Sequence, residues 1–131
     1  MTDREKIESI LYELASTNKM SSYFVNYATS DFEFIRPNGN PLNAMEYQEM
    51  MNSVGVVRLK AKITQIHKFE FFSADIAMCA FTLGASYYYE RDITNDLATF
   101  TSIFKKIDGT WKIYWMQRSL GNSDLSLWDK R

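Results

Sequence analysis

Two side chains in this sequence, His67 and Arg36, could carry chemistry. The stretch 58–72 alternates like a strand and places His67 on the same face as Ile63 and Phe69. An imidazole sheltered by apolar neighbours can act as an acid or a base near neutral pH. A histidine at that position can equally be a hydrogen-bonded residue of the core or its rim. We therefore take His67 as the candidate catalytic residue, with the structural role as the alternative.

Arg36 closes the predicted strand 31–36, on the same side as Phe34. A guanidinium that faces the interior needs a partner, because burying an unpaired charge is costly. The partner could be a carboxylate of the protein, either Glu70 or one on a strand next to Glu33. It could instead be the acidic group of a small ligand, held through two parallel hydrogen bonds. The sequence leaves both possibilities open.

Around Arg36 we expect a pocket for a small molecule with an apolar body and one acidic or polar end. Its predicted lining is mostly aromatic and comprises Tyr23, Tyr27, Phe34, Tyr47, Met50, Phe100, Trp115 and Gln117. One histidine and one cysteine at unrelated positions give no metal-ligand cluster. The sequence also has no glycine-rich phosphate loop and no nucleophile elbow. We therefore expect no metal and no cofactor.

The composition indicates one globular domain spanning residues 1–131. Hydrophobic residues make up 46% of the chain and aromatic residues 15%, enough for a core without disulfides. The net charge is −1 and the lysines are scattered, which argues against a nucleic-acid partner. Cys79 is the only cysteine, so no internal disulfide can form. With no apolar leader or membrane span in the sequence, we expect a soluble cytoplasmic protein without a membrane partner.

The elements that must position these side chains follow from periodicity. Helices are predicted from the Thr2–Glu5 capping pattern onward, over 20–28, and from Asn43 to near Gly55. Strands are predicted over 31–36, 58–72, 75–91 and 97–119, with a polar connection over 91–96. The segregation of helices and strands predicts an α+β domain with helices on one face of a curved sheet.

The last stretch, 97–119, is predicted to be a β-hairpin with a two-residue type I′ turn at Asp108-Gly109. Counting back from the turn pairs Ser102 with Trp115 and Phe100 with Gln117 on the core face. A bulged three-residue loop around Gly109 would instead shift the pairing by one and exchange the two faces.

Three segments, 31–39, 74–77 and 106–113, resemble the nuclear transport factor two-like superfamily, and within it the SnoaL-like and ketosteroid-isomerase-like proteins. The resemblance extends over nearly the whole chain. It implies a cystatin-like fold, in which N-terminal helices pack on the concave face of a cone-shaped, curved antiparallel sheet.

The residues that would carry the isomerase reaction do not transfer. The resemblance places the isomerase's base aspartate at Arg36, and a guanidinium cannot accept a proton. Its helix-one tyrosine falls near Leu11, and the paired histidines of the related dehydratases have only His67 to match them. We therefore expect no steroid isomerase activity. The resemblance implies a small-molecule-binding domain, or an isomerase-, cyclase- or hydratase-type enzyme, with a non-catalytic association module or a protein adaptor as the alternative.

A homodimer is predicted through the convex face of the sheet. Ile103, Tyr114 and Met116 are assigned to that face, where helices on the other side would leave them exposed. The tail carries Leu125, Leu127 and Trp128, which could extend this contact or cover the mouth of the pocket.

Overall fold

A computed structural model describes residues 1–16, 23–52 and 57–124 of the chain. It contains three helices, α1 (Asp3–Ser16), α2 (Tyr23–Tyr27) and α3 (Ala44–Met51). Five strands follow the order β1 (Ala28–Ile35), β2 (Val57–Ser73), β3 (Ile76–Tyr89), β4 (Asp92–Ile107) and β5 (Thr110–Arg118). The predicted α+β class is confirmed, and the apolar tail residues 125, 127 and 128 lie outside the described residues.

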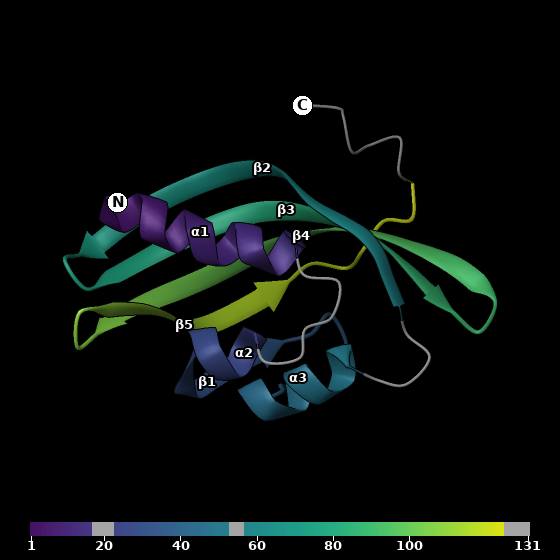
Figure 1. Cartoon of the computed structure of the whole chain (residues 1–131), viewed down its shortest axis with the longest axis horizontal. Coiled ribbons are helices and arrows are strands. Elements are labelled where there is room, and N and C mark those ends of the chain that lie inside the picture. The colour runs from purple at the N-terminus through teal and green to yellow at the C-terminus, as the bar shows by residue number, and fades with distance from the viewer. Residues whose placement is uncertain (17–22, 53–56, 125–131) are drawn as a thin grey trace.

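The five strands form one curved sheet in the order β1-β5-β4-β3-β2 (Figure 1). Strands β2 to β5 pair antiparallel, as predicted, but β1 runs parallel to β5. The sheet is therefore mixed rather than wholly antiparallel. Strand β1 is joined to the rest of the sheet through α3 and not through a hairpin, so its connection does not require it to reverse direction.

Reciprocal caps close the starts of two helices, α1 and α3. In α1 the Thr2 amide donates to Glu5 Oε1 at 3.0 Å, and the Glu5 amide donates to Thr2 Oγ1 at 3.1 Å. In α3 the same exchange links Asn43 and Glu46, at 2.9 and 2.8 Å. Each cap satisfies two amides that the first turn leaves without helical partners.

The core lies on the concave face of the sheet, beneath the helices. Helix α1 lies over β2, while α2 and α3 pack near β1 (Figure 1). The buried apolar stripe of α1 consists of Ile7, Ile10, Leu11 and Leu14. Fully buried partners from the strands include Phe34, Phe81, Phe104, Ile113 and Met116. None of the described helices is long and apolar enough to cross a membrane.

The β4–β5 hairpin agrees with the predicted register only near its turn. Asp108 and Gly109 have φ values of 50° and 79°, and the pairing is as predicted back to Phe104 opposite Ile113. There the register shifts by one residue, so that Ser102 pairs with Met116 and Phe100 with Arg118.

The face assignments of the β5 residues beyond this shift were therefore wrong. Trp115 and Gln117 lie on the convex face, because they pair with Ile103 and Thr101. Met116, predicted on the convex face, is fully buried in the core. A one-residue slip exchanges every subsequent side chain between the two faces of a sheet.

Strand β2 contains further irregularities, and these determine where His67 points. Register shifts fall between Ile63 and Gln65 and again between Ile66 and Lys68. As a result Ile66 lies opposite Phe81 on the core face, although strict alternation would turn it outward. The His67 ring hydrogen-bonds Thr82 Oγ1 at 2.5 Å, on the convex face. The predicted common face of Ile63, His67 and Phe69 is therefore wrong.

The polar run 91–96, predicted as a connection, belongs mostly to a strand. Strand β4 begins at Asp92, and only Glu90 and Arg91 form the turn, with φ values of 51° and 71°. The β3–β4 register continues without a shift from Tyr89–Asp92 to Ile76–Lys105. This extension of β4 places Asp96 on the concave face, opposite Ala85.

Candidate ligand-binding site

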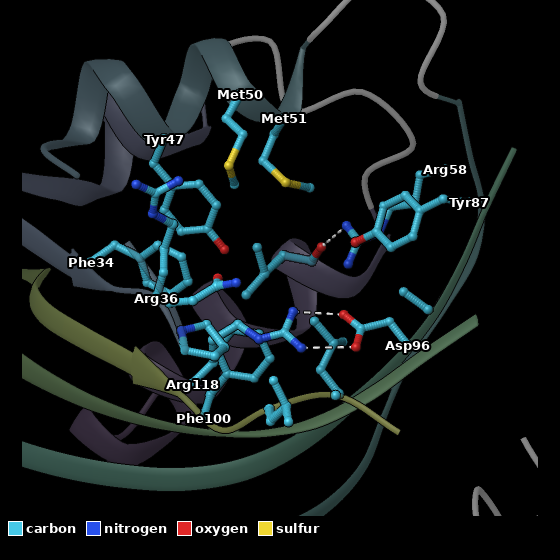
Figure 2. Close-up of a pocket in the computed structure, with 17 residues that line it drawn as sticks. Phe34, Arg36, Tyr47, Met50, Met51, Arg58, Tyr87, Asp96, Phe100 and Arg118 are labelled. Atoms are coloured by element: carbon cyan, nitrogen blue, oxygen red, sulfur yellow. Dashed lines mark hydrogen bonds and ion pairs between the residues drawn. The ribbon is translucent and has the colours of Figure 1, made fainter. Parts of the chain in front are cut away.

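A cavity of about 290 Å³ opens between helix α3 and the concave face of the sheet (Figure 2). Its apolar walls are formed by Leu14, Phe34, Met50, Met51, Leu83, Ala85 and Phe100. Polar side chains reach it from six elements or their flanking loops, and these are Arg36, Asn38, Tyr47, Arg58, Tyr87, Asp96 and Arg118. Pro37, Leu120 and Gly121 complete the lining. We refer to this site below as the cavity.

Five of the nine predicted ligand-binding residues line the cavity, namely Phe34, Arg36, Tyr47, Met50 and Phe100.

The remaining four lie elsewhere. Tyr23 is buried under α1, where its hydroxyl donates to the Ile10 carbonyl at 2.6 Å. The Tyr27 hydroxyl donates to the Glu13 carboxylate, outside the cavity. Trp115 and Gln117 are on the convex face because of the register shift in β5.

The floor of the cavity carries an ion pair between Arg118 and Asp96. Arg118 Nη1 lies 2.6 Å from Asp96 Oδ2 and Nη2 lies 2.8 Å from Oδ1 (Figure 2). Desolvation, the largest single influence, would lower the pKa of Arg118, but the hydrogen bonds and the charge attraction to Asp96 together raise this pKa above its ordinary value. The Arg118 guanidinium also lies 5.5 Å from the centre of the Phe100 ring. The pair is thus locked into a defined bidentate geometry.

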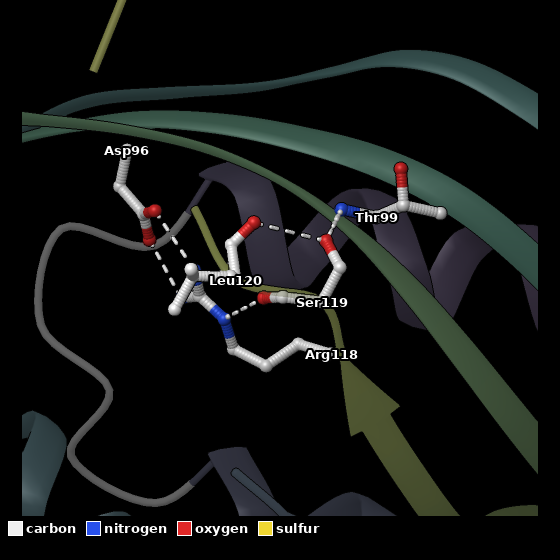
Figure 3. A network of polar contacts seen from close by, with 5 residues as sticks. All are labelled: Asp96, Thr99, Arg118, Ser119 and Leu120. Carbon is white, nitrogen blue, oxygen red and sulfur yellow. Dashed lines mark hydrogen bonds and ion pairs between the residues drawn. The ribbon is translucent and has the colours of Figure 1, made fainter. Parts of the chain in front are cut away.

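A short segment after β5 fixes this ion pair from the outside (Figure 3). Arg118 Nε donates to the Ser119 carbonyl at 3.1 Å, and the Ser119 amide donates to the Thr99 carbonyl at 2.8 Å. Further on, Leu97 and Asn122 exchange two backbone hydrogen bonds of 2.9 Å. Residues 119–124, here called the strap, therefore continue alongside β4 beyond the end of β5, and Leu120 and Gly121 form part of the cavity wall.

Arg58 is a second guanidinium of the cavity and is only 4% exposed. Its Nη1 donates to the carbonyl of Leu14, at the end of α1, at 2.5 Å (Figure 2). Tyr87 lies opposite Arg58 in the β2–β3 ladder. Burial raises the pKa of Tyr87, although the adjacent Arg58 opposes the shift, so this hydroxyl stays protonated near neutral pH.

Arg36 follows β1 and lies at the cavity wall, half-buried. Its Nε donates to the Asn40 carbonyl at 3.0 Å. The guanidinium packs over Gly39, where a Cβ would come within 2.9 Å of Nη2 and where φ is +93°. No carboxylate in the described residues pairs with Arg36, so the predicted internal partner, Glu70 or a neighbour of Glu33, is not the group that holds it.

The charges of the lining favour an anion over a proton-transfer reaction. Three guanidiniums and one carboxylate give the lining a formal charge of +2. The carboxylate of Asp96 has both oxygens occupied by Arg118, so it is not poised to accept a proton. Burial raises the pKa of Tyr47 as well as that of Tyr87, so both phenols remain neutral.

The other reactive side chains lie outside the cavity. His67 is exposed on the convex face, where Thr82 Oγ1 in turn lies 2.9 Å from Thr99 Oγ1. Cys79 is fully buried in the core, and burial raises the pKa of its thiol to about 12. The described residues contain no group of three or more histidine, cysteine or acidic side chains suited to a metal ion.

The sequence and the fold are similar to those of known proteins. The model of a family described as "Protein of unknown function (DUF3804)" matches residues 2–129. An NTF2-like protein of unknown function from Prochlorococcus sp. NATL2A, solved by crystallography, is 51% identical. It aligns with a TM-score of 0.88 over 98% of this chain and 100% of its own. The chain belongs to this NTF2-like family.

More distant NTF2-like structures share the fold alone. A candidate Ca/calmodulin-dependent kinase II association domain from Exiguobacterium sibiricum is 15% identical, with a TM-score of 0.80 over 95% of this chain and 97% of its own. A candidate ketosteroid isomerase from Parabacteroides distasonis is also 15% identical, with a TM-score of 0.66 over 87% and 84%. No curated protein matches the sequence with significance.

Three charged residues of this NTF2-like cavity escaped the sequence analysis, and each had a specific reason. The predicted hairpin register contained no bulge in β5, so it placed Gln117 rather than Arg118 on the core face. Asp96 was assigned to a loop. Arg58 is the first residue of the predicted strand 58–72, and its inward direction becomes visible only in the structure, from its burial and its hydrogen bond to Leu14. The one signal that the sequence offered was the position of Arg58 and Arg118 at the ends of predicted strands.

Proposed function

We propose that the cavity binds a small molecule with an apolar body and an anionic end. The observation that carries this proposal is the combination of three guanidiniums and a single carboxylate in a lining that is otherwise uncharged and mostly apolar. Its volume of about 290 Å³ lies at the lower limit of the about 300 to 1,000 Å³ typical of small-molecule sites.

Each part of such a ligand has a matching surface. Phe34, Met50 and Phe100 provide an apolar wall for the body of the ligand. Arg36 offers its terminal nitrogens to the anionic end, because its described hydrogen bond uses only Nε. A charge-assisted contact of this kind contributes about 1.5 to 3 kcal/mol to binding.

The geometry supports binding better than isomerase-, cyclase- or hydratase-type catalysis. Such reactions need a group within hydrogen-bond reach of the substrate that can take up a proton. In the described lining the one carboxylate is held by Arg118, and His67 lies on the opposite face of the sheet. A catalytic role would require Asp96 to leave its ion pair first.

The proposal is tested with two probes of the same shape and different charge. Phenylbutanoate carries the anionic end, whereas phenylbutanamide replaces the carboxylate with a neutral amide. We expect calorimetry and thermal unfolding to detect binding of the acid and at least tenfold weaker binding of the amide, as about 1.4 kcal/mol per tenfold implies. Equal binding of the two probes, or binding of neither, would count against an anion site.

We further propose that the protein forms a homodimer through the convex face. No described helix packs on that face, and Met78, Ile103 and Trp115 lie on it half-buried. At one end of the sheet the cross-strand neighbours Val57, Tyr88 and Ile93 are exposed. Contiguous apolar area of this kind is typical of an interface, and the NTF2-like fold is compatible with oligomer formation.

Sedimentation at micromolar concentration tests the dimer. We expect a dimer for the wild type and a monomer for Ile103→Lys, because a lysine opposite Met78 places a charge within the apolar area. Lys105→Ala is the matched control from the same strand, and it should leave the dimer intact. A wild type that sediments as a monomer would remove the proposal.

A further inference from the structure

The ring of Tyr47 is fixed by aromatic packing. It stacks on Phe34 with ring centres 4.0 Å apart and planes 15° apart, and on Phe24 at 4.2 Å and 21°. The residue is only 6% exposed. Because both faces of the ring are in contact with other rings, the hydroxyl has a single direction in which to point.

That hydroxyl points into the cavity (Figure 2). Within the described residues it takes part in no hydrogen bond, in contrast to the hydroxyls of Tyr23 and Tyr27, which donate to Ile10 and Glu13. Buried polar groups are nearly always paired, since an unpaired one loses its hydration without compensation. The hydroxyl of Tyr47 is therefore available to a molecule in the cavity.

The chemistry of this hydroxyl differs from that of the guanidiniums around it. Burial raises the pKa of Tyr47, so the phenol is neutral and can donate a hydrogen bond. A guanidinium is charged and best matched by a carboxylate, whereas a neutral phenol can donate a hydrogen bond to a carbonyl oxygen without a charge on either group. The cavity therefore offers two kinds of polar contact on different elements, Arg36 after β1 and Tyr47 on α3.

We propose that Tyr47 is a specificity-determining residue whose hydroxyl donates to a carbonyl oxygen of the ligand, and that the ligand class is accordingly the keto acids. This inference rests on the proposed anion site. It adds that a second oxygen, set apart from the carboxylate, is recognised by its own donor.

Matched probe pairs test the inference. Benzoylpropanoate and phenylbutanoate differ only by a ketone oxygen, and so do benzoylbutanoate and phenylpentanoate, with the ketone one carbon farther from the carboxylate. Calorimetry gives the affinity ratio of each pair for the wild type, for Tyr47→Phe and for Tyr12→Phe. Tyr12 is the control because it is an exposed tyrosine of α1 that does not line the cavity.

We expect the wild type and Tyr12→Phe to bind one keto acid roughly 2- to 12-fold more tightly than its matched acid, the range given by one neutral hydrogen bond. Tyr47→Phe should bind both members of that pair alike, and should bind the plain acid as the wild type does. Acids that bind without a ketone preference in any pair would overturn the role of Tyr47 and leave the anion site standing. If no acid binds, the anion site fails and the inference fails with it.

Thermal unfolding without ligand separates recognition from a structural role. Since the hydroxyl has no partner in the described residues, Tyr47→Phe should unfold at the same temperature as the wild type or higher. A fall of several degrees would show that the hydroxyl serves the fold, and that result would overturn the inference.

Discussion

Arg118 and Arg36 both line the cavity, but the protein holds them in different ways. Arg118 uses both terminal nitrogens on Asp96 and its Nε on the Ser119 carbonyl. Arg36 uses Nε on the Asn40 carbonyl, and no described carboxylate pairs with it. The first guanidinium is therefore part of the wall, whereas the second still has donors for a ligand.

Because the two arginines are held differently, comparing them separates a contribution to stability from a contribution to ligand binding. An ion pair at the cavity floor stabilises the arrangement of β4, β5 and the strap, and its charge is largely neutralised. A guanidinium held by a backbone carbonyl can be replaced without leaving a carboxylate stranded. The cost of removing each arginine should consequently appear in stability for Arg118 and in ligand affinity for Arg36.

The largest effect is expected for Arg118→Met. The change leaves Asp96 without its partner in a partly enclosed site, and losing one member of a buried pair costs about 3 to 5 kcal/mol. The side chains of Arg118 and Asp96 are 19% and 25% exposed, so we expect a smaller loss of roughly 2 to 4 kcal/mol in the free energy of unfolding. Denaturant titration measures it.

A double variant is the control for this prediction. Combining Arg118→Met with Asp96→Asn removes the stranded carboxylate, so the pair should cost less than the sum of the single changes. If the two costs add, the ion pair contributes nothing of its own, and the distinction between the arginines would be lost.

The next effect is that of Arg36→Met on ligand binding. Methionine keeps much of the length of the side chain and removes its charge, so phenylbutanoate should bind about 1.5 to 3 kcal/mol more weakly. The free energy of unfolding should stay within about 0.5 kcal/mol of the wild type. Calorimetry and denaturant titration give the two values. Lost stability with unchanged affinity would instead indicate that Arg36 is held by a partner within the protein.

Local chemistry made part of this site predictable. The Asn43–Glu46 cap positions α3, and with it Tyr47 and Met50, and that cap is visible as a sequence pattern. The Asp108-Gly109 turn likewise determined the register of β4 and β5 as far as Phe104. Caps and tight turns depend on a few adjacent residues, so the sequence carries them in full.

The far half of the hairpin was not predictable in the same way. Residues 113–116 are Ile, Tyr, Trp and Met, all large and apolar, so alternation carries no information on which of them faces the core. The register shift there is decided by packing against α2, β1 and β4, which are distant in sequence. It exchanged Gln117 for Arg118 in the cavity and hid the ion pair with Asp96.

The strap gives a smaller effect that tests how the ion pair is positioned. A Cβ at Gly121 would lie 1.8 Å from Asp96 Oδ1 and 2.8 Å from Arg118 Nη2. Gly121→Ala must therefore displace the strap or distort the pair, and we expect it to cost about 1 to 2 kcal/mol of stability. Ser123→Ala, an exposed change in the same segment, should cost less than about 0.5 kcal/mol. Equal melting temperatures for these two variants would show that the strap does not brace the pair.

The smallest effect is expected for His67→Ala. This variant removes a polar side chain outside the cavity and so serves as the comparison for the two arginine variants. The imidazole lies on the convex face with Thr82 as its partner, so its removal changes no cavity wall. One hydrogen bond at an exposed position is worth no more than about 1 kcal/mol of stability. Phenylbutanoate should bind this variant as it binds the wild type, whereas Arg36→Met should weaken binding measurably in the same assay. If His67→Ala lost as much affinity as Arg36→Met, His67 would have to contact the ligand. Its position on the convex face would then not hold in the ligand-bound protein.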